Sequence, residues 1–220
     1  SDNRAESTTT LSIPLTTKWK YQTGVDTAST PSIDGNLVIF GDNNGVLRAL
    51  DINNGSETWR AATQSSAIRT GVAVSAGKVV AGTNGGVVFA VNESDGSAIW
   101  SRTVGGVITG SPLIVNGVVY VASTNGTLYA MDLNNNGNDI WAPYPTGAMV
   151  QSSPAYYNGM VYITNANGWI RAVNATTGVA SWSQQFAAHN FSGSPVVENG
   201  RVYIVSQSLA TIRVLDANTG

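Results

Sequence analysis

Tryptophan recurs at an almost constant spacing in this 220-residue chain, and this spacing constrains the fold more than any other feature. The gaps between five of the six tryptophans are 40, 41, 41 and 41 residues. A fixed period near forty residues is the mark of a repeat architecture. The chain therefore repeats one structural unit, and Trp169 lies outside the series. The five regularly spaced residues are Trp19, Trp59, Trp100, Trp141 and Trp182.

The residues before four of these tryptophans repeat as well. They follow the pattern Ala-x-Asp/Asn-x-x-x-Gly-x-x-x-Trp at residues 49–59, 90–100 and 172–182, and with one extra residue at 130–141. Asp or Asn side chains bond the backbone two residues on, and glycine supplies a left-handed conformation, so the pattern predicts a turn before a strand.

The third unit shows most clearly what one repeat contains. Apolar residues alternate at 111–115, 118–122 and 127–131, and a fourth strand is expected around 140–142. Asn116-Gly117 between the first two is a typical tight hairpin turn. Four antiparallel strands in roughly forty residues are one blade of a β-propeller. The sequence therefore predicts an all-β propeller.

The two ends of the chain are in matching phase. A strand of the fourth type is expected at residues 17–23, whereas the chain ends after a strand of the third type. We expect the first strand to complete the last blade and close a five-bladed ring, which would remove an open sheet edge. The alternative is that the chain is part of a larger propeller. Residues 1–15 are predicted to be a disordered lead-in to a domain at 16–220, with blades at about 24–62, 63–103, 104–144, 145–185 and 186–220 plus 16–23.

This turn pattern resembles the tryptophan-docking motif of quinoprotein propellers. Together with Ser-Pro at strand starts and the stretch Asn-Gly-Thr-Leu-Tyr-Ala at 125–130, it makes residues 19–220 similar to the PQQ-like repeat family. The resemblance implies that each of the five indoles stacks on the motif of the neighbouring blade. It also implies the alternative of a ring with seven or eight blades, which are the numbers common in that family.

The composition of the chain excludes several classes of function. The chain has no cysteine, so disulfides and thiolate chemistry are excluded. Quinoprotein dehydrogenases typically use an adjacent-cysteine disulfide, so the resemblance implies the non-catalytic branch, without PQQ. A net charge of −2 and 11% charged residues predict no nucleic-acid partner. No apolar stretch is long enough for a membrane-spanning helix. The neutral, lysine-poor composition is more typical of exported proteins.

Four residues are candidates for contact with a ligand or a partner. The connections between blades, at 23–29, 63–69, 103–109, 146–151 and 186–192, vary most among the repeats. Arg69 is the one charged residue at the position three before the strand-opening proline, which is replaced by Val72 in its own unit, and Gln151 lies at the same position in the fourth unit. His189, the one histidine, is expected to be an ordinary loop residue or, alternatively, a general base. Trp169 is expected either to contact a partner or to pack under a loop.

No metal site is predicted, although one loop has oxygen ligands at alternate positions as calcium loops do. Its candidate ligands are Asp132, Asn134 and Asn136, but the loop lacks the glutamate that would complete such a site. The sequence thus favours a non-enzymatic extracytoplasmic propeller (periplasmic, secreted or on the cell surface) that binds a protein or cell-surface partner as a scaffold. The alternatives are a fragment of a PQQ-dependent oxidoreductase and a ligand-sensing domain of a surface receptor.

Overall fold

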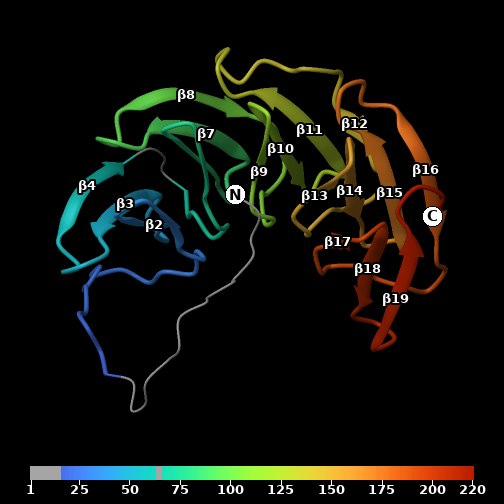
Figure 1. Ribbon diagram of the computed structural model, residues 1–220, viewed down its shortest axis with the longest axis horizontal. Coiled ribbons are helices and arrows are strands. Elements are labelled where there is room, and N and C mark those ends of the chain that lie inside the picture. The colour runs from blue at the N-terminus through green and yellow to red at the C-terminus, as the bar shows by residue number, and fades with distance from the viewer. Residues whose placement is uncertain (1–15, 63–65) are drawn as a thin grey trace.

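The computed structural model describes residues 16–62 and 66–220, so the predicted lead-in at residues 1–15 lies outside them. In this part of the chain, nineteen strands form five antiparallel sheets. The sheets follow one another in chain order around an arc (Figure 1). The predicted all-β fold built from four-stranded antiparallel sheets is confirmed.

We refer to the five sheets as blades 1 to 5. Blade 1 contains β1 (Ser32–Asp34), β2 (Leu37–Gly41), β3 (Val46–Asp51) and β4 (Glu57–Ala62). Blade 2 contains β5 (Ala73–Ser75), β6 (Lys78–Gly82), β7 (Val87–Asn92) and β8 (Ala98–Thr103). Blade 3 contains β9 (Leu113–Val115), β10 (Val118–Ser123), β11 (Thr127–Asp132) and β12 (Tyr144–Pro145). Blade 4 contains β13 (Ala155–Tyr157), β14 (Met160–Thr164), β15 (Trp169–Asn174) and β16 (Ala180–Gln185), and blade 5 contains β17 (Val196–Glu198), β18 (Arg201–Ser206) and β19 (Thr211–Asp216).

The first hairpin of each blade follows from its turn residues. In blade 3, Asn116 and Gly117 have φ values of 50° and 78°, the pair of positive values that a type I′ turn requires. Such a turn matches the twist of the flanking strands, so β9 and β10 pair directly. The hairpin predicted at this position is present.

The blades are held together by apolar side chains from their facing sheets. Between blades 1 and 2, Ile39 and Leu47 pack with Val79 and Phe89, all at most 1% exposed. The same arrangement recurs between each later pair of blades. Blades 2, 3 and 4 therefore each pack one face on the preceding blade and the other on the following blade. Burial of these faces stabilises the stack by roughly 25 cal/mol per Å².

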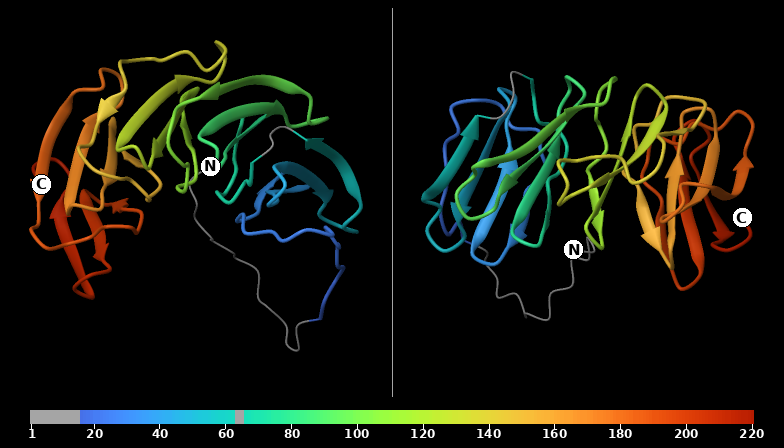
Figure 2. Two further views of the ribbon diagram at one scale, coloured as in Figure 1. Left: turned by 180° about the vertical axis from the view of Figure 1, so that it is seen from behind. Right: turned by 90° about the horizontal axis from the view of Figure 1, so that it is seen from above.

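The structure shows an arc rather than the predicted closed ring. Blade 5 has three strands in the described part of the chain, and residues 17–23 form no strand. They lie beside blade 1, at the opposite end of the arc from β19 (Figures 1 and 2). A strand is stabilised by its hydrogen bonds to a neighbouring strand. Residues 17–23 do not lie at a free sheet edge, which explains why they form no strand.

Blade 3 departs from prediction at its outer strand. The expected strand around residues 140–142 is replaced by an isolated bridge between Met131 and Asp139, followed by the short β12. The preceding turn has an additional residue, and Pro143 has no amide hydrogen to donate to the ladder. No helix in residues 16–62 or 66–220 is long and apolar enough to cross a lipid bilayer.

Candidate functional site

The indole groups of the regular series all make the same contact with the next blade. Each Nε1–H donates to the carbonyl oxygen of the residue that follows the Asp or Asn of the turn. The distances are 2.9 Å from Trp19 to Ile52, 2.7 Å from Trp59 to Glu93, 3.1 Å from Trp100 to Leu133, 3.1 Å from Trp141 to Ala175 and 2.9 Å from Trp182 to Ala217.

The glycine of each turn makes room for the indole. At Gly137, with φ of 68°, an added Cβ would lie 2.9 Å from a ring carbon of Trp100. Glycine is required there both for its backbone conformation and for the close approach of the ring. The same relation holds at Gly55, Gly96, Gly178 and Gly220. This geometry supports the docking role implied by the family resemblance, and the role itself stays a prediction.

Two tyrosines that the sequence reasoning missed reinforce this joint. The hydroxyl groups of Tyr120 and Tyr162 donate to the carbonyl oxygens of Ala175 and Ala217, at 3.0 and 2.9 Å. These are the carbonyl groups that also accept the indole N–H. Burial, followed by the charge of Tyr156, raises the pKa of Tyr120 to about 12. A Val-Tyr pair in the second strand of units three to five was the available signal.

A network of charged groups ties the N-terminal segment to blade 1. The guanidinium group of Arg48 contacts Asp42 at 3.0 Å and Glu57 at 3.2 Å, and both Arg48 and Asp42 are at most 6% exposed. The Tyr21 hydroxyl and Arg60 also donate to Glu57. Burial alone would raise the pKa of Glu57, but these hydrogen bonds outweigh it and lower that pKa. The network fixes where residues 16–23 meet blade 1.

Arg69 and Gln151 lie on different connections and are both exposed. Nε of Arg69 donates to Oδ1 of Asn43 at 3.2 Å, across the boundary between blades 1 and 2. Oγ1 of Thr109 donates to the backbone carbonyl of Gln151 at 3.3 Å. Both side chains remain available to a partner, although no contact joins them to one another.

His189 is buried rather than placed on an open loop. It is 6% exposed, and its ring stacks on Phe191 with the centroids 5.5 Å apart. Its Nε2 lies 3.1 Å from Nη2 of Arg213, whose guanidinium group covers the ring of Phe186. This packing supports a structural role for His189 and leaves little access for a substrate.

Trp169 lies in a half-buried position at the start of β15. The guanidinium carbon of Arg171 lies 4.5 Å from the centroid of its ring, a cation–π contact. Burial lowers the pKa of Arg171, and the contact with Tyr144 opposes this shift. Trp169 therefore packs against a residue of its own blade and stays partly exposed.

The candidate calcium loop is already occupied by protein contacts. Oδ1 of Asp132 accepts the backbone N–H of Asn134 at 2.8 Å, and the ammonium group of Lys78 donates to Oδ1 of Asn134. A cation at this position would compete with the lysine, which disfavours calcium. Within residues 16–62 and 66–220, no group of three or more His, Asp or Glu side chains is arranged to hold a metal ion.

Asp34 and Glu93 form a pair of carboxylates across blades 1 and 2. Burial, and then the charge of Asp34, raises the pKa of Glu93. A raised pKa stabilises the fold at low pH, and this contribution is lost as pH rises through the folded-state pKa. We therefore expect Glu93→Gln to increase stability at pH 7, by less than about 1 kcal/mol because the pair is partly exposed. Thermal melts should show the gain at pH 7 and lose it near pH 4, and a lower melting temperature at pH 7 would contradict the prediction.

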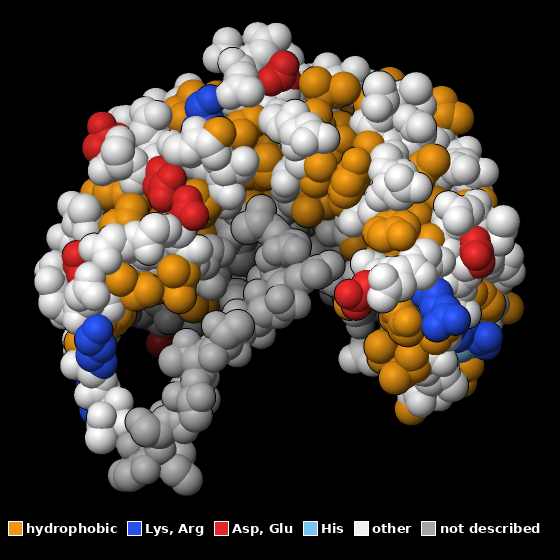
Figure 3. All heavy atoms as spheres, viewed as in Figure 1, with side chains coloured by type: hydrophobic (Ala, Val, Ile, Leu, Met, Phe, Trp, Pro, Cys, Tyr) orange, Lys and Arg blue, Asp and Glu red, His pale blue; other side chains and the backbone are white. Residues whose placement is uncertain are grey.

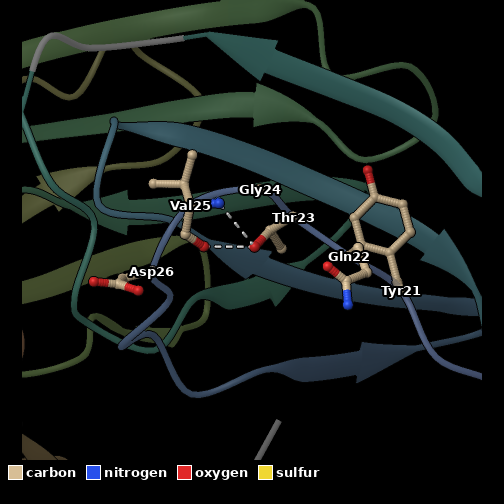
Figure 4. Close-up of a pocket in the computed structure, with 6 residues that line it drawn as sticks. All are labelled: Tyr21, Gln22, Thr23, Gly24, Val25 and Asp26. Carbon is tan, nitrogen blue, oxygen red and sulfur yellow. Dashed lines mark hydrogen bonds between the residues drawn. The ribbon is translucent and has the colours of Figure 1, made fainter.

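One open hollow of about 520 Å³ lies beside blade 1 (Figure 4). All six residues that line the hollow belong to one continuous segment. Within this segment, the Thr23 hydroxyl is hydrogen-bonded to the backbone of Val25. Since no second element encloses the hollow, it offers a ligand little burial. None of the residues predicted as site candidates lines it. The lining residues are Tyr21, Gln22, Thr23, Gly24, Val25 and Asp26.

The repeated sheets and the indole contacts define this protein as a β-propeller protein with PQQ-like repeats. The chain belongs to the family described as outer membrane protein assembly factor BamB, whose model matches residues 14–70 and 43–220. The recognition of the PQQ-like repeat family is thereby confirmed. A search of curated protein sequences finds no match.

Solved structures share the fold at low identity. BamB from Moraxella catarrhalis aligns with a TM-score of 0.81 and 20% identity, covering 92% of this chain and 62% of that one. The designed protein Ika8 aligns with a TM-score of 0.77 and 18% identity, covering 84% and 57%. The quinohemoprotein alcohol dehydrogenase ADHIIG from Pseudomonas putida HK5 aligns with a TM-score of 0.72 and 20% identity, covering 90% and 43%. The chain thus spans less than two thirds of each of these structures.

Proposed function

We propose that this protein is a non-enzymatic, extracytoplasmic propeller that binds proteins as an assembly scaffold. The observation that carries the proposal is that the protein's polar side chains at the joints between blades form hydrogen bonds and ion pairs within the protein. The indole groups, Tyr120, Tyr162 and the Arg48 network all bond to the protein itself, and His189 is packed against phenylalanine rings. These groups stabilise a rigid frame, while exposed connection residues such as Arg69 and Gln151 remain free to meet a partner.

The family description supports both the role and the location. It names an assembly factor for outer membrane proteins, which work outside the cytoplasm. The composition agrees with this location, since a nearly neutral, lysine-poor chain is more typical of exported proteins. We expect the partner to be a protein that docks on the connections between blades, because these vary most in sequence and project from a rigid scaffold.

Site-specific photocrosslinking tests this proposal. A crosslinking amino acid at Arg69 or Gln151, in protein exported to the periplasm of a Gram-negative host, should give one discrete adduct with another protein. The same group at Thr176, an exposed residue of a turn between strands, is the matched control and should give none. Absence of adducts at both connections, or equal labelling at Thr176, would overturn the proposal.

A second candidate function follows from the similarity to the quinohemoprotein dehydrogenase. In this alternative the chain is part of a PQQ-dependent oxidoreductase. Incubation with PQQ and calcium, followed by a dye-linked alcohol oxidation assay, separates the two functions. Oxidation above the level of free PQQ would overturn the non-enzymatic proposal. A ligand-sensing role would instead appear as a ligand-induced rise in melting temperature without turnover.

A further inference from the structure

One arginine at the joint between blades 3 and 4 lacks the partner that its equivalents have. The third residue of the third strand is arginine in blades 1, 4 and 5, as Arg48, Arg171 and Arg213. Arg48 pairs with two carboxylates, and Nη2 of Arg213 lies 3.1 Å from Nε2 of His189. In the part of the chain that the structure describes, no carboxylate pairs with Arg171, and its Nη1 atom is buried without a hydrogen-bond partner.

The repeat itself shows which acceptors blade 4 has lost. In blade 1 the two carboxylates come from Asp42, which lies between the second and third strands, and from Glu57 in the outer strand. The equivalent positions in blade 4 hold Asn165 and Ala180. The side-chain oxygen of Asn165 already accepts two backbone N–H groups of its own turn, both at 3.1 Å. Blade 4 therefore keeps the cation of blade 1 and lacks both of its carboxylates.

Neutral groups surround the guanidinium group of Arg171. Its central carbon lies 4.5 Å from the centroid of the Trp169 ring, and its polar contact across the joint is with the hydroxyl group of Tyr144 in blade 3. Burial lowers the pKa of Arg171, so these surroundings disfavour its charge. A half-buried cation without a counterion costs free energy that an anion beside it would recover.

An opening beside Gly147 leads to this cation. Gly147 is exposed and has a φ value of 77°. Among the described residues other than its chain neighbours, the single atom within 4 Å of a Cβ added to Gly147 is Nη2 of Arg171, at 3.9 Å. A guanidinium N–H binds a carboxylate oxygen at about 2.7–2.9 Å, so an acceptor placed in this space would reach Nη2.

The rim of the opening is held in place and is partly apolar. Nδ2 of Asn165 donates to the carbonyl oxygen of Thr146 at 2.8 Å, and the N–H of Ala166 donates to that of Met149 at 2.9 Å. The Met149 side chain is 41% exposed. Trp169 is half-buried at a position where the other blades have valine or threonine. The opening is thus formed before a ligand binds, with apolar surface close to the cation.

The charge of the site matches one carboxylate group. Charged residues make up 11% of the chain, and the face of the molecule in Figure 3 is mostly apolar or uncharged. A polyanion binds through several basic groups, so it fits this surface poorly. The acceptors of the equivalent Arg48 are carboxylates, whose two oxygens match the planar guanidinium group.

We propose that the opening beside Gly147 binds an acidic side chain of the partner protein. The carboxylate accepts from Nη2 of Arg171 and neutralises the guanidinium group, and an apolar residue next to it contacts Met149 or Trp169. Blades 3 and 4 each pack against a blade on both sides, so the site is complete within the chain (Figure 1). A protein as the source of the carboxylate rests on the proposed scaffold function, whereas the site itself rests on the geometry of this joint.

Matched peptides test the site. The probe is the peptide Ala-Glu-Leu-Ala with blocked ends, and its control is Ala-Gln-Leu-Ala. In an NMR titration that follows the indole N–H signal of Trp169, identified by its loss in Trp169→Phe, the glutamate peptide should bind about tenfold more tightly, because its hydrogen bond is charged. Acetate should bind about fivefold more weakly than this peptide, because it lacks the apolar side chain. Equal binding of the two peptides would overturn the site, and acetate binding as tightly as the glutamate peptide would overturn a protein as its ligand.

Variants show whether Arg171 is the cation that binds. Arg171→Gln should abolish the preference for the glutamate peptide. Ala180→Glu restores the carboxylate that blade 1 has at this position, so it should also abolish the preference and raise the melting temperature. It adds a partner instead of removing one, so it keeps the test decisive if Arg171→Gln does not fold. Arg60→Gln is the matched control, an arginine with a 63% exposed side chain that has its own carboxylate partner, and should bind normally. An unchanged preference in Ala180→Glu would overturn the proposal.

The results also separate this site from the scaffold function. Crosslinked adducts at the connections, together with equal binding of the two peptides, would overturn the Arg171 site alone. Selective binding of the glutamate peptide, without any crosslinked adduct, would overturn the scaffold function and a protein as the source of the carboxylate.

Discussion

Replacing Trp100 with alanine is expected to lower the free energy of unfolding by about 3–5 kcal/mol. The indole is 7% exposed and belongs to the core between blades 2 and 3. Its removal leaves a cavity over Gly137 and leaves the Leu133 carbonyl oxygen without its donor at 3.1 Å. Chemical denaturation followed by circular dichroism would measure the loss.

Two variants separate the contribution of the ring from that of the hydrogen bond. Trp100→Phe keeps most of the apolar contact and loses the N–H, so it should cost about 1–3 kcal/mol, as an unsatisfied buried acceptor does. Trp169→Ala is the matched control outside the regular series, since Trp169 is half-buried and contacts Arg171 of its own blade. A loss below about 1 kcal/mol for Trp100→Ala would mean that the joint does not depend on this indole.

The sequence predicted the blades because their signals are local. The turn at Asp51 and Gly55 needs only a carboxylate that bonds the backbone and a residue with positive φ, and both are visible in a short stretch. The hairpin turn at Asn116 and the alternation of the strands are equally local. The irregular outer strand of blade 3 was missed because the effect of Pro143 depends on strand pairing. Its missing amide hydrogen matters only where the outer strand would bond to its neighbour, and the sequence alone does not show that pairing.

Features that depend on contacts between different blades or hairpins could not be predicted in this way. Strand phase predicted that residues 17–23 would complete blade 5, but phase alone does not decide whether the two ends of one chain meet. The hydroxyl contact of Tyr120 spans 55 residues, and its acceptor is a backbone carbonyl group that no side-chain pattern marks. His189 is buried by two aromatic neighbours close in sequence and by Arg213 from the next hairpin. Of the candidate site, the sequence could identify the variable connections but not which side chains remain accessible there.

Replacing Asp42 with alanine is expected to destabilise the protein by about 3–5 kcal/mol, as the loss of one partner of a buried ion pair does. Asp42 is 0% exposed, and its carboxylate lies 3.0 Å from Nη2 of Arg48, which is 6% exposed. The same carboxylate accepts the backbone N–H groups of Asn44 and Val46 at 2.9 and 3.0 Å. Its removal would leave a buried guanidinium group with Glu57 as its remaining ion-pair partner, and would release the turn that begins β3. Thermal and chemical denaturation would measure the loss.

Arg60→Ala provides the matched control within the same network. Arg60 also bonds a carboxylate, that of Glu57, but its side chain is 63% exposed. Exposed ion pairs contribute about 0–1 kcal/mol because solvent screens them, so Arg60→Ala should change stability little. The double variant Asp42→Ala with Arg48→Leu should recover part of the loss, because it removes the unpaired charge and leaves an apolar side chain opposite Phe40 in the β2–β3 ladder. Equal losses for Asp42→Ala and Arg60→Ala would show that burial of the Arg48 pair does not govern the stability of blade 1.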